Sequence, residues 1–204
     1  VGVRLAPGID ADFAGATITL NDDGSINLST SVAEIGNGSN TVLSQMAAEV
    51  LGVPTEKIMV ITGDTDAIPM GWGARASRNT AIGGEAVRQA AEKVKGQVLE
   101  VAAKMLEVSL EDLEVHTEGV SVRGAPERSL SLSEIVKANR YRKDGQAMWA
   151  QVHYDAPSEL ADKKTGRGNF SSAFAFGAKA VELEVDSDTG EVQILRVVSA
   201  SDIG

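Results

Sequence analysis

The feature that most constrains the fold is a long helical repeat near the middle of the chain. Apolar residues recur at helical spacing between about residues 78 and 107 and fall on one face: Val87, Ala90, Ala91, Val94, Val98, Val101, Ala102, Met105 and Leu106. The repeat predicts one long helix whose alanine-rich face belongs to the core rather than to a binding surface. With 43% hydrophobic residues among 204, the chain can bury such a core, so disorder is not expected.

Shorter patterns surround this helix. Two strand-like runs, 16–20 and 25–30, flank a glycine-containing turn and predict a hairpin. Helical spacing over about 39–51 ends at Gly52, and a β-branched run at 57–62 predicts a returning strand.

Two serines further along the chain have the spacing of a capping box. Ser109 and Ser131 are each followed three residues later by an acid, a pattern typical of the first turn of a helix, so each is predicted to begin a short helix. The stretch 139–172 is mixed and polar, and 162–168 within it is predicted to be a loop. Near the end, apolar and acidic residues alternate, which predicts a long β-hairpin over 174–200 with one solvated face.

The order of these elements predicts an α+β fold, with a mixed β-sheet covered by two main helices.

The absence of cysteine excludes disulfides, thiolate metal sites and iron–sulfur ligation within this chain, and it suits a reducing compartment such as the cytoplasm. A net charge of −10 argues against nucleic acid and anionic membranes as partners. No apolar run is long enough to span a bilayer. The abrupt start and end suggest a piece of a longer protein.

Two glycine-rich loops stand at predicted helix starts. The first, Glu34–Thr41, has glycines on both sides of Asn37. The second, Gly73–Gly84, carries Ser77, Asn79, Thr80 and two arginines. A helix start presents unpaired N–H groups and a partial positive charge, so both loops are candidate phosphate sites, and adjacent strands would place them together. The alternative is that their side chains only cap helices and that the arginines pair with surface acids. Neither loop has a Walker or Rossmann pattern, which disfavours ordinary ATP or NAD binding.

Other chemistry-bearing residues are assigned no function. His116 and His153 lack carboxylates at metal-ligand spacing, and the acidic pair Asp64 and Asp66 lacks the spacing of a calcium loop, so no metal site is predicted. Trp72, between two glycines, either stacks on a flat ligand or packs against its own domain.

The motifs together resemble the molybdopterin-binding large subunit of the xanthine dehydrogenase/aldehyde oxidase family. The resemblance is carried in order by four stretches: Glu34-x-Gly36-Asn37-Gly38-x-x-Thr41, then Gly63-Asp64-Thr65-Asp66, then Ala76-Ser77-Arg78-x-Thr80, and finally the 176–204 tail. It implies that residues 1–204 are part of a molybdopterin-binding domain of the molybdenum cofactor-binding type, with the remainder of the subunit absent.

The family's function is implied with the fold. Such enzymes are molybdenum hydroxylases that oxidise a heterocycle, an aldehyde or a similar small molecule by inserting oxygen derived from water, or that oxidise carbon monoxide. The resemblance implies a molybdenum–molybdopterin cofactor, in the cytosine dinucleotide form that bacterial relatives use, with FAD and 2Fe-2S groups in other domains or subunits. The residues that would bind this cofactor are Gly36, Asn37, Gly38, Ser39, Thr41, Ala76, Ser77, Asn79 and Thr80.

The resemblance also has departures. The family commonly has glutamine where this chain has Asn37, so one side-chain hydrogen bond to the cofactor is lost or rerouted through water. The family's catalytic glutamate lies in sequence beyond Gly204, so no catalytic residue is assigned here.

Two other functions stay open: a non-catalytic interaction or assembly module derived from the family, and an unrelated phosphate binder. The expected partners are the rest of the molybdenum subunit, iron–sulfur and flavin subunits and a small-molecule substrate. Apolar surface left uncovered would also favour a homodimer.

Overall fold

A computed structural model describes residues 12–157, 162–168 and 176–202. Its main sheet has four strands in the order β3-β2-β1-β7. The bounds of these strands are Phe13–Leu20 (β1), Ile26–Thr30 (β2), Ile58–Ile61 (β3) and Trp149–Asp155 (β7). β1 runs antiparallel to both β2 and β7, whereas β3 runs parallel to β2, so the predicted mixed sheet is confirmed.

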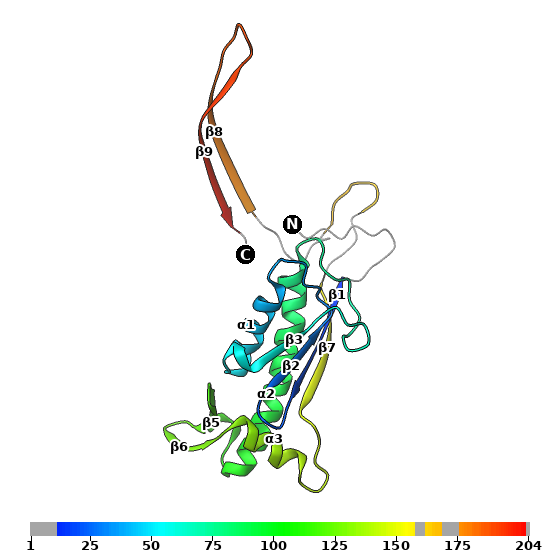
Figure 1. Cartoon of the computed structure of the whole chain (residues 1–204), viewed down its shortest axis with the longest axis vertical. Coiled ribbons are helices and arrows are strands. Elements are labelled where there is room, and N and C mark those ends of the chain that lie inside the picture. The colour runs from blue at the N-terminus through cyan, green and yellow to red at the C-terminus, as the bar shows by residue number, and fades with distance from the viewer. Residues whose placement is uncertain (1–11, 158–161, 169–175, 203–204) are drawn as a thin grey trace.

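Two helices cover one face of this sheet (Figure 1). They are α1, Ser39–Leu51, and α2, Gly84–Leu106, and they pack against each other as well as against the strands. Because successive residues of a strand point to opposite faces, every second residue of β1 is buried beneath α2: Ala14, Ala16, Ile18 and Leu20. The prediction of a sheet covered by two main helices is therefore confirmed. No helix in the described part of the chain is long and apolar enough to cross a membrane.

The start of the long helix differs from the prediction. Residues 79–83 wind as a π-helical turn before the regular α2, and the N–H of Gly84 bonds to the carbonyls of Asn79 and Thr80. Gly83 lies close to Val32, since a Cβ on Gly83 would lie 2.3 Å from Val32 Cγ2. A wider turn of this kind is uncommon and often occurs at functional sites.

A small three-stranded sheet and a third helix lie at the far end of α2 (Figure 1). The strands are Leu113–His116 (β4), Gly119–Val122 (β5) and Ala125–Leu130 (β6). The helix α3, Leu132–Arg140, begins with the capping box that was predicted at Ser131.

The capping box predicted at Ser109 is wrong. The side chain of Ser109 caps nothing, and only a 3₁₀ turn, Leu110–Asp112, forms before β4. The reason is tertiary pairing, because the carbonyl of Asp112 accepts a hydrogen bond from the N–H of Arg123 at 2.7 Å and the chain passes directly into the small sheet.

Strand β7 was not predicted, because the sequence of 139–172 looked mixed and polar. Ala150 and Val152 are buried within β7, and Tyr154 on the same face packs partly buried against the core, while the alternate side chains are exposed. The strand is defined by its long-range pairing with β1. Residues 162–168, predicted to be a loop, form turns in which the Asp162 carboxylate accepts hydrogen bonds from the N–H groups of Lys164 and Thr165.

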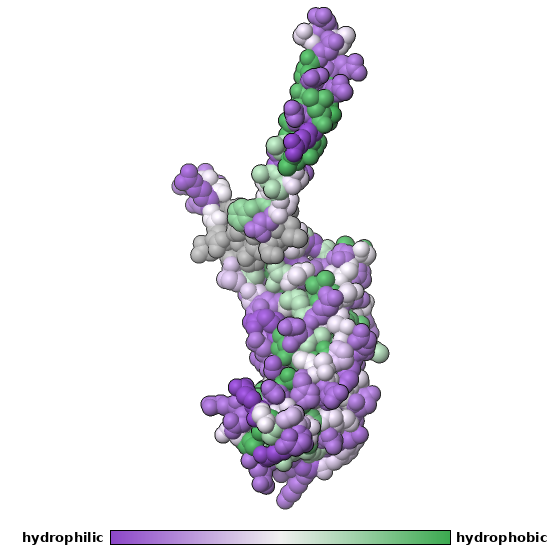
Figure 2. All heavy atoms as spheres, turned by 90° about the vertical axis from the view of Figure 1, so that its left-hand side faces the viewer, coloured by the Kyte–Doolittle hydropathy of each residue, from purple (hydrophilic) through white to green (hydrophobic). Residues whose placement is uncertain are grey.

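The last described segment is a two-stranded hairpin, β8 (Phe176–Val185) with β9 (Val192–Asp202). It extends away from the sheet and helices (Figure 1), and all of its residues are exposed. Apolar side chains therefore lie open along its length (Figure 2). They include Val181, Leu183, Val185, Val192, Ile194 and Val197, which are 46–62% exposed. Residues 174 and 175, part of the hairpin predicted from the sequence, lie outside the described residues.

Candidate functional site

One pocket of about 380 Å³ lies where the start of α1 meets the π-helical turn. Both glycine-rich loops line it: Ile35, Asn37 and Ser39 come from the first, with Val42 of α1 beside them, and Ala74, Arg75, Ala76, Ser77, Arg78, Asn79 and Thr80 come from the second. Its volume is within the range of small-molecule sites. The parallel pairing of β2 with β3 brings the two loops to the same end of the sheet.

Six of the nine residues proposed from the sequence line this pocket: Asn37, Ser39, Ala76, Ser77, Asn79 and Thr80. Gly36, Gly38 and Thr41 belong to the first loop but are not part of the lining. The pocket residues Ile35, Val42 and Ala74 were not predicted, because their apolar side chains give no chemical signal in the sequence. Both arginines of the second loop were predicted as candidates, with no distinction between their roles.

The first loop is shaped by its own side chains. Gly36 and Gly38 have φ of 89° and 75°, the left-handed region that glycine adopts without a steric penalty. Glu34 Oε1 accepts hydrogen bonds from the N–H of Gly36 at 2.8 Å and of Gly38 at 3.1 Å, and Oε2 accepts one from Asn40 N at 3.0 Å. These backbone donors, Asn40 first, lower the pKa of Glu34 below its ordinary value against the opposing effect of desolvation.

A chain of polar contacts joins the two loops. Ser39 Oγ donates to Asn37 Oδ1 at 2.8 Å and accepts from Asn79 Nδ2 at 2.8 Å. Asn37 and Ser39 belong to the first loop and Asn79 to the second. The pocket is therefore a joint structure of both loops.

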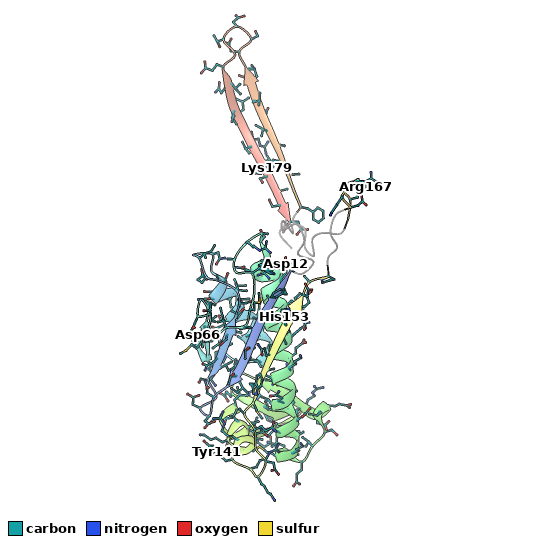
Figure 3. The ribbon with its side chains drawn as sticks, turned by 90° about the vertical axis from the view of Figure 1, so that its right-hand side faces the viewer. Asp12, Asp66, Tyr141, His153, Arg167 and Lys179 are labelled. Carbon is teal, nitrogen blue, oxygen red and sulfur yellow. The ribbon has the colours of Figure 1, made fainter. Side chains whose placement is uncertain are left out.

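The second loop contains two strained residues and a buried arginine. Ala76 and Ser77 have φ of 47° and 55°, which is uncommon for residues with a Cβ and is found often at functional sites. The Arg78 side chain is only 1% exposed and bonds to Asp12 Oδ1 at 2.9 Å, to the carbonyl of Gly73 at 2.9 Å and to the carbonyl of Phe13. Arg78 therefore anchors the loop to the first residue of β1 and to Asp12 just before it, which is labelled in Figure 3.

Arg75 is the other arginine of this loop, and its guanidinium contacts an aromatic ring instead of a carboxylate. Its guanidinium carbon lies 5.3 Å from the centre of the Trp72 ring, a cation–π geometry. The Trp72 ring also packs against Phe13, with 5.8 Å between ring centres. Trp72 thus contacts its own domain, as the second of its two sequence interpretations held, and Arg75 remains at the pocket.

Several buried polar atoms near these loops have no hydrogen-bond partner in the described part of the chain. They are Asn40 Oδ1, Trp72 Nε1, Arg75 Nε and Asn79 Oδ1. Of these four residues, Arg75 and Asn79 line the pocket. Buried polar atoms are nearly always bonded in a finished structure, so the two unpartnered atoms at the pocket favour a polar ligand that supplies the partners. The residues present therefore suit a ligand with both donors and acceptors.

The remaining candidates form no second site. His153 packs on Phe13, with ring centres 4.3 Å apart, and His116 Nδ1 accepts from the N–H of Glu118. Asp64 Oδ1 accepts from the N–H of Asp66 within a turn. Within the described ranges, no three His, Cys, Asp or Glu side chains come together as a metal site would require.

Comparison with known proteins gives a consistent result. A family model described as "Molybdopterin cofactor-binding domain" matches residues 2–204. The chain is 34% identical over 198 residues to a xanthine dehydrogenase molybdenum-binding subunit of Escherichia coli O157:H7, covering 96% of this chain and 25% of that subunit. It is 30% identical over 196 residues to the carbon monoxide dehydrogenase large chain of Afipia carboxidovorans, covering 94% of this chain and 22% of the relative.

The fold is also similar to solved structures. Quinoline 2-oxidoreductase from Pseudomonas putida 86 matches with a TM-score of 0.75 and 29% identity, over 97% of this chain and 24% of that one. This chain thus spans about a quarter of the length of the curated relatives it matches.

Proposed function

We propose, from the premise that this chain belongs to the family of molybdopterin cofactor-binding domains, that its pocket holds the phosphate end of a molybdenum–molybdopterin cofactor. The observation that carries this proposal is the convergence of both glycine-rich loops on one pocket bordered by unpartnered polar atoms. A cofactor with phosphate oxygens and pterin nitrogens has the acceptors and donors that such atoms need.

The residues that would hold this cofactor are Asn37 and Ser39 on the first loop, and Ala76, Ser77, Asn79 and Thr80 on the second. Arg75 adds a positive charge at the pocket. Gly36, Gly38 and Thr41 would support the conformation of the first loop without lining the pocket. The bound cofactor supplies the two-electron chemistry by which oxygen from water enters a C–H bond. The contribution of this chain is to bind and orient it through backbone amides, hydroxyls and one guanidinium.

The activity proposed for the whole protein is that of a molybdenum hydroxylase. Relatives named for xanthine, for carbon monoxide and for quinoline support a small-molecule substrate and leave its identity open among heterocycles, aldehydes and similar compounds. We extend the proposal to the cytosine dinucleotide form of the cofactor, to FAD and 2Fe-2S groups in other domains or subunits, and to a cytoplasmic location.

The partner proposed first is the rest of a molybdenum subunit, with iron–sulfur and flavin subunits beyond it. A two-stranded hairpin by itself is marginally stable in water. We therefore expect another protein surface to pack against the exposed apolar side chains of β8 and β9. A homodimer through the same face is the competing arrangement. The same face also favours the second candidate function, a non-catalytic assembly module derived from this family.

The proposed function is tested by Thr80→Leu in the protein that contains this domain. Thr80 lines the pocket, and leucine there removes a hydroxyl and adds bulk where the phosphate would lie. The loss of one or two hydrogen bonds to a charged group predicts about a tenfold fall in molybdenum content, measured by mass spectrometry of the purified protein. Thr117→Leu, at an exposed turn distant in the fold, is the matched control. A normal molybdenum content in Thr80→Leu would contradict the proposal and favour the assembly module.

A further inference from the structure

The first loop already contains a negative charge where a phosphate was expected to bind. The Glu34 carboxylate lies within 3.1 Å of the backbone nitrogens of Gly36, Gly38 and Asn40. These are the amides that a helix start and a glycine-rich loop would offer to an anion.

One further amide of this helix start is also used within the chain, and the first hydrogen bond of the helix follows it. The N–H of Ser39 points to Asn37 Oδ1 at 3.4 Å, and the N–H of Val42 bonds to the carbonyl of Gly38 at 3.1 Å. A ligand that approached the start of α1 would therefore find the N–H groups of Gly36, Gly38, Ser39 and Asn40 committed to the protein's own acceptors, with the N–H of Thr41 left open among the described residues.

The charge of Glu34 makes this exclusion stronger. Its hydrogen bonds from Asn40, Gly36 and Gly38 hold the pKa of the carboxyl below its ordinary value, so the group is ionised at neutral pH. A phosphate brought to the same amides would meet a like charge at hydrogen-bonding distance. Two anions at these donors would repel each other and compete for the same N–H groups.

The second loop is arranged differently. The backbone N–H groups of Ala76 and Ser77 have no carbonyl or side-chain partner among the described residues. Arg75 lies beside them at the same pocket. The partly buried Asp12 is already paired with Arg78 of this loop.

We propose that Glu34 is a positioning residue that serves as an internal anion: it neutralises the start of α1, fixes the first loop, and thereby leaves the second loop to bind the negative end of the cofactor. The assignment of the cofactor's phosphate rests on the proposed function. The occupation of the α1 start by Glu34 is tested without any cofactor.

The test is a titration of Glu34→Ala with inorganic phosphate at neutral pH, followed by the backbone amide signals of Gly36, Gly38 and Asn40 in NMR spectra of the 204-residue chain. Removing the carboxylate frees these donors, so phosphate is expected to bind there at least about tenfold more tightly than in the unaltered protein. A residue with a merely structural role would create no anion site when removed. Acetate, which resembles the lost carboxylate, is expected to compete with phosphate in this variant.

Two further variants keep the test decisive. Glu34→Gln retains the side-chain volume, so it serves as the second variant if Glu34→Ala unfolds. Its affinity for phosphate is also expected to rise. Glu49→Ala, an exposed acid on α1, is the matched control and should leave the titration unchanged. The proposal is overturned if a folded Glu34 variant shows no phosphate-dependent shift at the three amides, or if the unaltered protein shifts as much. Failure of the proposed function would instead appear as normal molybdenum content in Thr80→Leu, with the phosphate titration unaffected.

Discussion

The two loops that form the pocket are stabilised by side chains of opposite charge. In the first loop, the carboxylate of Glu34 accepts hydrogen bonds from the backbone N–H groups of Gly36 and Gly38. In the second loop, the guanidinium of Arg78 bonds to Asp12 and to the Phe13 carbonyl, and the backbone N–H groups of Ala76 and Ser77 stay open. Two loops with similar glycine-rich sequences at helix starts are therefore not equivalent as anion sites.

The largest effect is expected from removing the anchor of the second loop. Arg78→Met leaves Asp12 partly buried without its partner and frees two carbonyls, so the free energy of unfolding should fall by about 3–5 kcal/mol, measured by urea denaturation. Arg88→Met is the matched control, because Arg88 pairs with Glu85 and Glu92 on an exposed face of α2, so its loss should lower the free energy of unfolding far less. Similar losses in both variants would remove the distinction between a buried anchor and a surface pair.

A smaller effect is expected at the contact that joins the loops. Ser39 and Asn79 meet through a 2.8 Å hydrogen bond across 40 positions of sequence. A double-mutant cycle with Ser39→Ala and Asn79→Ala should therefore give a coupling of about 0.5–1.5 kcal/mol in the free energy of unfolding. Ser44→Ala, which removes a local bond to the Thr41 carbonyl on the same helix, should show no coupling to Asn79→Ala. Additive changes at Ser39 and Asn79 would mean that the loops are independent.

The smallest effect concerns the pH dependence of the first loop. The pKa of Glu34 lies below its ordinary 4.5 in the folded protein and returns to that value on unfolding. Its contribution to stability is therefore complete above about pH 4.5 and is lost as the pH falls through the folded-state pKa. The stability deficit of Glu34→Gln should be largest at neutral pH and should close on acidification, in denaturation curves between pH 3 and pH 7. A deficit that stays constant across this range would count against the ionised contact, and Glu49→Gln gives the baseline.

Much of the fold was predictable because it follows from local periodicity. The spacing of apolar residues located α1 and most of α2, and the alternation and turn signals located β1, β2 and β3. The capping box at Ser131 was predictable and the one at Ser109 was not, although their sequences look alike. The difference is that β4 begins immediately after the Ser109 turn and commits the carbonyl of Asp112 to Arg123.

The candidate site was predictable as two loops and not as one pocket. Residue types gave Asn37, Ser39, Ser77, Asn79 and Thr80, because hydroxyls and amides at helix starts have a recognisable pattern. The separate roles of Arg75 and Arg78 had no local signal, since the two differ only in burial.

The sequence by itself determined the order of elements, the glycine-rich helix starts and the family to which the chain belongs, because these depend on residue types and spacings along the chain. Only the tertiary structure decided which charges are already used. The partner of Arg78 is 66 positions away and that of Asn79 is 40 positions away, and β7 forms only by pairing with β1. A donor or a charge is open to a ligand only when no other part of the folded chain reaches it first, and that depends on distances in space.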